Sequence, residues 1–132
     1  MIYLDDTAVS KFIVAQPETE VLRAYLYQNS AYRWFTSAFT AYDLLRARPA
    51  DAAHIRTAVA SLDTVAITDR LLASTVDAPP GISMIDAVHI AAALTAGARL
   101  RAFITYDPHR AEAARVARLP IAQPGIGHHA GQ

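Results

Sequence analysis

The chain has 132 residues, 53% of them hydrophobic and 18% charged, so we expect one domain with one core. Twelve Lys and Arg balance twelve Asp and Glu, which excludes binding to nucleic acid or anionic membrane through overall charge alone. The absence of cysteine excludes disulfide scaffolds, thiol nucleophiles and cysteine-based zinc sites. The longest apolar run, residues 90–98, is too short for a membrane span, and the amino terminus lacks a secretory pattern, so we expect a cytoplasmic protein.

Short apolar runs alternate with segments of helical periodicity. In chain order they predict a strand over 2–4, helices over 7–14 and 18–28, a strand over 34–37, helices over 38–46 and 50–62, a strand over 65–68, helices over 69–74 and 83–98, a strand over 102–105, a helix over 107–117 and a strand over 119–122. We expect Asp69 and Ser83 to begin their helices as caps, with Gly97 closing the longer one.

This alternation predicts an α/β fold. The strands are continuously apolar rather than alternating, which indicates a mainly parallel central sheet of about five short strands with helices on both faces. We place this single domain over residues 1–124 and expect residues 125–132 to be a disordered tail. His128 and His129 are interpreted as part of that tail rather than as a metal site.

Four acidic residues stand out by their positions. Asp5 and Asp107 follow the first and fourth strands, where ligands bind in open α/β sheets. Asp86 lies in the first turn of a helix, and Asp43 lies among apolar neighbours in the middle of another. Asp5, Asp86 and Asp107 have an equally good explanation as helix caps or dipole partners, but Asp43 caps nothing. Carboxylates brought together require a cation, and an all-oxygen set suits Mg²⁺ or Mn²⁺ rather than zinc.

The segments that carry these acids resemble the four motifs of the PIN-domain family, and in particular the VapC toxins of bacterial VapBC toxin–antitoxin pairs. The matching segments are Met1-Ile2-Tyr3-Leu4-Asp5, Thr36-Ser37 with Asp43-Leu44-Leu45-Arg46, Asp86-Ala87-Val88-His89-Ile90-Ala91, and Ile104-Thr105-Tyr106-Asp107. The resemblance extends from Met1 to Gly125 in the same order. It implies a PIN-like fold and an endoribonuclease that depends on Mg²⁺ or Mn²⁺ and leaves 5′-phosphate and 3′-hydroxyl ends.

The resemblance also assigns roles to residues. It implies that Asp5, Asp43, Asp86 and Asp107 are catalytic, and we expect Asp5, Asp86 and Asp107 to hold the metal. The chain departs from the family pattern at two positions, because the second acid is usually Glu and the residue after the first acid is usually Thr or Ser. Side chains alternate along a strand, so we expect Asp6 to face a helix cap or solvent rather than the site.

Four neighbours of the acids are expected to support them or to touch substrate: Thr7, Arg46, His89 and Thr105. Arg46 and His89 each lie three residues beyond an acid on one helix face. Arg46 could form an ion pair with Asp43 or contact phosphate, and we favour His89 as a packed core residue over a metal ligand. The RNA backbone needs positive charge near an acidic pocket, for which the candidates are Arg46, Arg48, Arg99, Arg101 and Arg110.

The main hypothesis is therefore metal-assisted hydrolysis of RNA by a toxin. Its implied partners are RNA, a cognate VapB-type antitoxin and a second copy of the chain. One alternative is a degenerate PIN-like module that acts only through protein contacts, with Asp43 and Asp6 as signs of decay. Another is a phosphotransfer domain, which the single lysine, Lys11, on the first helix argues against.

Overall fold

A five-stranded, fully parallel sheet forms the centre of the computed structural model, which describes residues 1–126. The strand order is β3-β2-β1-β4-β5, with bounds β1 (Ile2–Leu4), β2 (Trp34–Ser37), β3 (Asp63–Val65), β4 (Ala102–Ile104) and β5 (Ile121–Ala122). Every neighbouring pair is parallel, as the continuously apolar strands predict. The predicted fold class is confirmed. The remaining residues, 127–132, lie outside the described part of the chain, and so does most of the predicted tail with His128 and His129.

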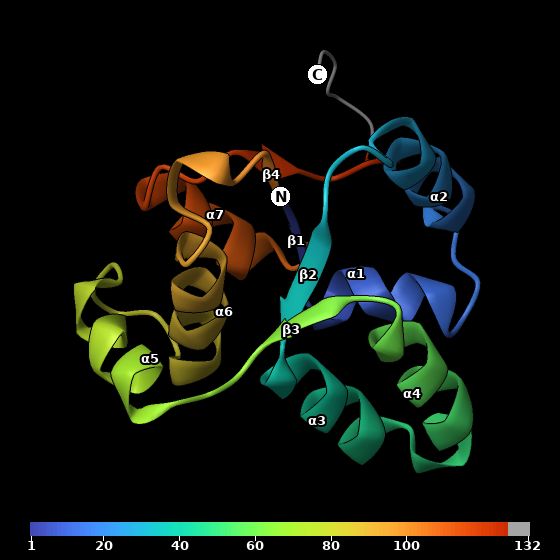
Figure 1. The fold of residues 1–132 in the computed structure, drawn as a ribbon, viewed down its shortest axis with the longest axis horizontal. Coiled ribbons are helices and arrows are strands. Elements are labelled where there is room, and N and C mark those ends of the chain that lie inside the picture. Colours follow the sequence, from blue (N-terminus) through green and yellow to red (C-terminus); the bar gives the residue numbers. More distant parts are fainter. Residues whose placement is uncertain (127–132) are drawn as a thin grey trace.

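Helices cover both faces of the sheet (Figure 1). The helices are α1 (Asp6–Val9), α2 (Thr19–Gln28), α3 (Ala38–Ala47), α4 (Ala52–Ala60), α5 (Asp69–Ser74), α6 (Met84–Leu94) and α7 (Pro108–Val116). Short 3₁₀ turns extend some of them, at Ser10–Phe12, Pro49–Asp51, Thr75–Asp77 and Gly97–Arg99. No helix of the described residues is long and apolar enough to cross a membrane.

The core is divided by the sheet into two layers. Ile2 and Leu4 of β1 point to the layer formed with α1 to α4, whereas Tyr3 points to the layer formed with α6 and α7. Because both faces of the central strand are covered, β1 is almost completely buried. Residues directly beyond its carboxyl end are therefore held by a rigid, fully packed strand.

The differences from the predicted elements lie mostly at their ends. The third strand begins at Asp63 rather than Val65, because its register pairs Phe35 with Asp63 and Ser37 with Val65. It is an edge strand that begins with exposed polar residues, so the apolar run over 65–68 does not indicate where the strand begins. The predicted Asp69 cap is wrong, since Thr68 accepts the capping hydrogen bond from the Leu71 amide.

Candidate active site

The acidic residues gather beyond the carboxyl ends of β1 and β4. These strands are neighbours in the sheet, although the chain first runs outward through β2 and β3 before it returns to form β4. The strand order therefore reverses between β1 and β4. In open α/β sheets, ligands bind beyond the carboxyl ends of the strands at such a point. Asp5 is the first residue after β1, and Asp107 lies three residues after the end of β4.

Asp5 is completely buried and its carboxylate is fixed from several directions. Oδ1 accepts hydrogen bonds from Thr7 Oγ1 at 2.6 Å and from the Ala8 amide at 2.9 Å. Asp5 is thus the N-cap of α1, and this local role coexists with a place in the acidic cluster. Thr7 Oγ1 also accepts from the Tyr106 amide at 2.8 Å, which ties the ends of β1 and β4 together.

Arg110 lies among the acids and links three of them. Its Nη1 is 2.6 Å from Asp5 Oδ2 and 2.7 Å from Asp6 Oδ1, and its Nε is 2.7 Å from Asp86 Oδ1. Burial alone lowers the pKa of the guanidinium, but the charges of Asp5 and Asp6 and the hydrogen bond to Asp86 outweigh burial and raise that pKa. Arg110, a sequence candidate for contacting the RNA backbone, is therefore a permanent positive charge inside the cluster, paired with the acids themselves.

Asp6 belongs to this cluster, so the expectation that it faces a cap or solvent is wrong. Strand alternation does not apply to it, because β1 ends at Leu4 and Asp6 already begins helix α1. Its carboxylate contacts Arg110 and lies 3.3 Å from His89 Nε2. Burial raises the pKa of Asp6, but His89 and the charge of Arg110 outweigh it and bring the pKa down to about 2.

Asp86 reaches the cluster from α6. Ser83 caps this helix, as predicted, because its hydroxyl accepts a hydrogen bond from the Asp86 amide at 3.1 Å. The helix is buried continuously from Asp86 to Ala93, so the first turn is anchored by the core behind it. The carboxylate of Asp86 is mostly covered and is held by Arg110.

Asp43 and His89 complete a second group with Asp6. One ligand atom from each of these three residues lies within 4.8 Å of the other two. His89 is fully buried, and its Nδ1 pairs with the Tyr3 hydroxyl at 2.7 Å, whereas its Nε2 has no aligned hydrogen-bond partner among the described residues. Burial and the charge of Asp6 raise the pKa of Asp43.

Asp107 is partly exposed at the start of α7, and its carboxylate forms no ion pair within residues 1–126. Its carboxylate caps α7 by accepting a hydrogen bond from the Arg110 amide at 3.0 Å. Thr105 Oγ1 accepts from the Asp107 amide at 3.2 Å and orients this turn. The cap therefore fixes the start of the helix that carries Arg110, so Asp107 is linked to the other acids through the backbone of that residue.

The remaining arginine candidates form no ion pair with the acids of the cluster within residues 1–126. Arg46 donates a hydrogen bond to the Tyr42 hydroxyl at 3.0 Å and forms no ion pair with Asp43 within residues 1–126. Arg48 pairs with Asp51. The backbones of Arg99 and Arg101 bond to Met1, which places them at the amino edge of the sheet, opposite the acids.

The donor set fits a hard divalent cation. Asp6, Asp43 and His89 lie close enough together to share an ion, and they offer two carboxylates, the ligands preferred by Mg²⁺ and Mn²⁺, with an imidazole nitrogen that Mn²⁺ accepts. Asp5 and Asp86 lie beside this group and share Arg110 with Asp6. The sequence places Asp6 at a cap or in solvent and offers Arg110 only as one of five arginines that could contact RNA, so the ion pairs between them are not predicted. A signal for Arg110 exists, because a positive charge in the first turn of a helix opposes the helix dipole unless carboxylates lie nearby.

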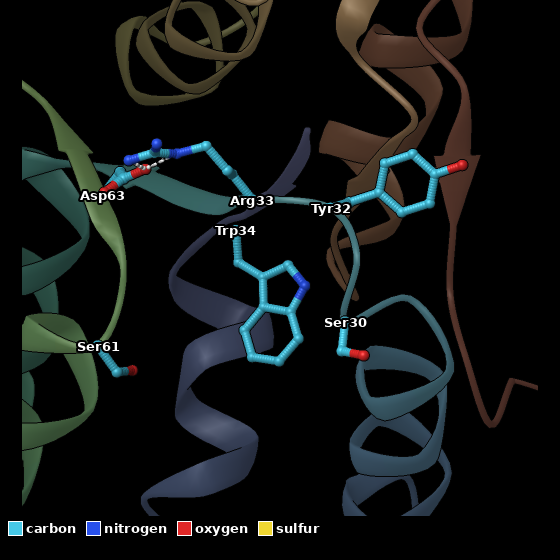
Figure 2. Close-up of a pocket in the computed structure, with 6 residues that line it drawn as sticks. All are labelled: Ser30, Tyr32, Arg33, Trp34, Ser61 and Asp63. Atoms are coloured by element: carbon cyan, nitrogen blue, oxygen red, sulfur yellow. Dashed lines mark hydrogen bonds and ion pairs between the residues drawn. The ribbon is translucent and has the colours of Figure 1, made fainter.

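A pocket of about 280 Å³ lies at the opposite, amino edge of β2 and β3 (Figure 2). The exposed ion pair between Arg33 and Asp63, at 2.7 Å, forms one side of it, and the indole of Trp34 lies between Ser30 and Ser61. None of the acids of the cluster lines this pocket. The chemistry-bearing residues are therefore at the carboxyl edge, and the pocket is separate from them.

Comparison with known proteins identifies the family. No protein-family model matches the chain. The chain is 37% identical to Ribonuclease VapC35 of Mycobacterium tuberculosis over 133 aligned residues, which cover 95% of this chain and 98% of the relative. It is 31% identical to Ribonuclease VapC47 of the same organism, with the same coverage of both chains.

Solved structures show the same fold at low sequence identity. A chain of FitAB bound to an IR36 DNA fragment superposes with a TM-score of 0.73 at 18% identity, covering 98% of this chain and 99% of that chain. The sarcin–ricin loop cleaving toxin VapC20 of Mycobacterium tuberculosis superposes with a TM-score of 0.66 at 14% identity, covering 94% and 100%. With the fold shared by these structures and the sequence shared by the curated relatives along almost their whole length, the chain belongs to the VapC ribonuclease family of PIN-domain toxins.

Proposed function

We propose that this protein is the toxin of a toxin–antitoxin pair and an endoribonuclease that hydrolyses RNA phosphodiester bonds with Mg²⁺ or Mn²⁺ in the cytoplasm. The observation that carries the proposal is that Asp5, Asp6 and Asp86 all contact the guanidinium of Arg110 at the carboxyl edge of the sheet. The curated relatives are named ribonucleases, which favours RNA as the substrate.

The carboxylates assigned to the metal are Asp5, Asp86 and Asp107, with Asp6 as a further candidate that the structure adds. A bound divalent ion would lower the pKa of a water molecule and neutralise charge that develops on the phosphate. Asp5 is suited to holding an ion because Thr7 and the Ala8 amide fix Oδ1 by hydrogen bonds. With Oδ1 fixed, the direction of Oδ2 is also fixed. Thr105 contacts only the backbone amide of Asp107, so it orients the turn that carries Asp107 and leaves the carboxylate free of that contact.

Asp43 has a different task in this proposal. Its pKa is raised by burial and by Asp6, so its carboxylate accepts a proton more readily than an ordinary aspartate. It lies partly exposed on α3, where substrate and water can reach it. We assign it to orienting the attacking water and accepting its proton, with His89 holding Asp6 in place beside it.

The partners follow from the charge of the site. An acidic cluster attracts an arginine, whose fork can bind carboxylates in a bidentate manner. We propose that the antitoxin inserts such a residue across the acids and silences them, within a hetero-oligomer built on a dimer of this chain. FitAB, a structural neighbour, was solved bound to DNA. The antitoxin partner is tested by co-expression with the small reading frame beside the gene, followed by light scattering.

The experiment that tests the activity is sequencing of RNA ends after brief expression. Asp5→Asn should abolish the cleavage seen with the natural protein, because it removes a carboxylate charge while keeping the side-chain size. Asp77→Asn is the matched control, since Asp77 is exposed on the 3₁₀ turn after α5. In vitro, the purified protein should cleave RNA in the presence of Mn²⁺, and EDTA should stop this cleavage. Cleavage that survives Asp5→Asn would contradict the proposal, and an inert monomer without a partner would favour the degenerate module.

A further inference from the structure

The centre of the acidic cluster is occupied by a side chain of the protein itself. Arg110 is 5% exposed, and its Nη1 and Nε point at three carboxylates within 2.7 Å. No other Lys or Arg of residues 1–126 forms an ion pair with Asp5, Asp6 or Asp86. This one guanidinium is therefore the positive charge that holds those acids together.

The position of Arg110 is unfavourable by local rules. It is the third residue of α7, and a cation near the start of a helix is disfavoured by the helix dipole. Burial of a guanidinium also carries a desolvation penalty. Both effects are overcome only because carboxylates surround the guanidinium. The position of Arg110 is therefore explained by its ion pairs with the acids and not by any contribution to helix stability.

The oxygen atoms that Arg110 contacts are those that a metal ion would need. Asp5 Oδ2 and Asp86 Oδ1 belong to two of the residues assigned to the ion, and the other oxygen of Asp5 is already used by Thr7 and the Ala8 amide. Asp6 strengthens the hold on Arg110, because Nη1 contacts both neighbouring acids. The guanidinium and a divalent cation therefore draw on the same carboxylate oxygens.

We infer that Arg110 is an internal counter-ion that competes with the catalytic metal for Asp5, Asp6 and Asp86. This inference rests on the proposed function, since it assumes that a divalent ion binds these acids. In the metal-free protein Arg110 keeps the carboxylates close together and neutralises part of their charge. When an ion binds, it replaces Arg110 at some of the carboxylate oxygens. The affinity of the protein for metal is therefore lower than it would be without Arg110.

The test is the affinity for Mn²⁺, measured by calorimetry or by the electron paramagnetic resonance signal of free Mn²⁺. Arg110→Gln removes the charge and keeps a polar side chain. We expect it to bind Mn²⁺ at least about tenfold more tightly than the natural protein, and its melting temperature to be lower without metal but to rise more when metal is added. Arg115→Gln is the control on the same helix, because Arg115 is exposed and pairs with Glu112 at 3.0 Å. It should leave the affinity unchanged.

The possible outcomes separate the inference from the proposed function. A folded Arg110→Gln variant with equal Mn²⁺ affinity overturns the inference and leaves Arg110 a structural residue, and weaker affinity overturns it in favour of a role in orienting the ligands. If the variant unfolds without metal, refolding on addition of Mn²⁺ supports competition, whereas failure to refold contradicts it. If neither the natural protein nor Arg110→Gln binds Mn²⁺, the metal part of the proposed function fails as well.

Discussion

Among the acids near the cluster, Asp43 has the least compensation of its negative charge by basic side chains. Its pKa is raised, first by burial and then by Asp6, and it forms no ion pair with a Lys or Arg of the described residues. A carboxyl whose pKa is higher in the folded chain favours folding below its unfolded pKa, and this contribution is lost as the pH rises through the folded value. At neutral pH the ionised Asp43 therefore lowers the free energy of unfolding.

Replacement of Asp43 should separate stability from activity. Asp43→Asn should raise the melting temperature at pH 7 by up to a few degrees, and the difference should shrink as the pH falls toward about 3. RNA cleavage should drop by about 10- to 100-fold or more. Asp43→Glu restores the usual family residue and should be tolerated. If Asp43→Asn cleaves RNA at the same rate as the natural protein, this acid has only a structural role.

Thr7 is the residue that joins Asp5 to the end of β4. Thr7→Val removes the hydroxyl that donates to Asp5 and accepts from the Tyr106 amide, at nearly unchanged volume. It should lower the free energy of unfolding by about 1–3 kcal/mol, because two buried groups lose their partner, and it should slow cleavage. Thr7→Ser keeps the hydroxyl and should restore most of both. Urea unfolding and cleavage assays on the same preparations check this, and full activity in Thr7→Val would contradict it.

Individual site residues are predictable where the local sequence determines their place. Asp5 follows a short apolar strand, and Asp86 follows a capping serine, so both could be located from the sequence. Asp6 could not, because its direction depends on a helix that starts at once after the strand. The role of Arg110 could not be assigned either, since its pairing with Asp5 spans 105 positions and only the folded sheet brings them together.

At the scale of elements, helix caps serve both folding and the site. Asp107 begins α7 by accepting the Arg110 amide, and a carboxylate or an amide side chain can do this equally well. Asp107→Asn should therefore keep the stability within about 0.5 kcal/mol, whereas Asp107→Ala should cost about 1 kcal/mol. If Asp107 also serves the metal, both variants should lose RNA cleavage.

Thr68→Ala provides the matched control for that comparison. Thr68 caps α5, a helix that carries no acid of the cluster, and the loss of this cap should cost a similar free energy without slowing cleavage. The free energies come from urea unfolding. Full activity in Asp107→Asn would remove Asp107 from the site and leave it a cap.

The elements themselves were largely predictable, and the reason is burial. Strands such as Ile2–Leu4 and Trp34–Ser37 are apolar and central, and the predicted ranges match the structure. The predicted third strand, 65–68, overlaps the observed one only at Val65, because an exposed edge strand is defined by backbone pairing rather than by side chains. The long predicted helix ends early, at Leu94, because the chain tightens into a 3₁₀ turn at Gly97, where φ is +57°.

At the scale of the whole molecule, the two edges of the sheet have different roles. The acids occupy the carboxyl edge, whereas Arg99 and Arg101 lie beside the amino terminus at the other edge. Arg99→Ala and Arg101→Ala should therefore leave the cleavage of a short RNA within about twofold of the natural protein, because phosphate contacts act locally. Initial rates on the same oligonucleotide check this. A large loss would mean that bound RNA extends around the molecule to the far edge.

The central place of β1 also determines when the acidic cluster can exist. The first strand pairs with β4, and Asp5 meets Arg110, only after almost the whole polypeptide has been synthesised. At typical elongation rates this delay is on the order of ten seconds. Until then β1 can pair only with β2, and Asp5 and Asp6 beyond its end lack the guanidinium of Arg110. No truncated product that ends before β4 can assemble the cluster. A ribosome that makes this protein is therefore not exposed to a finished nuclease centre until translation is nearly complete.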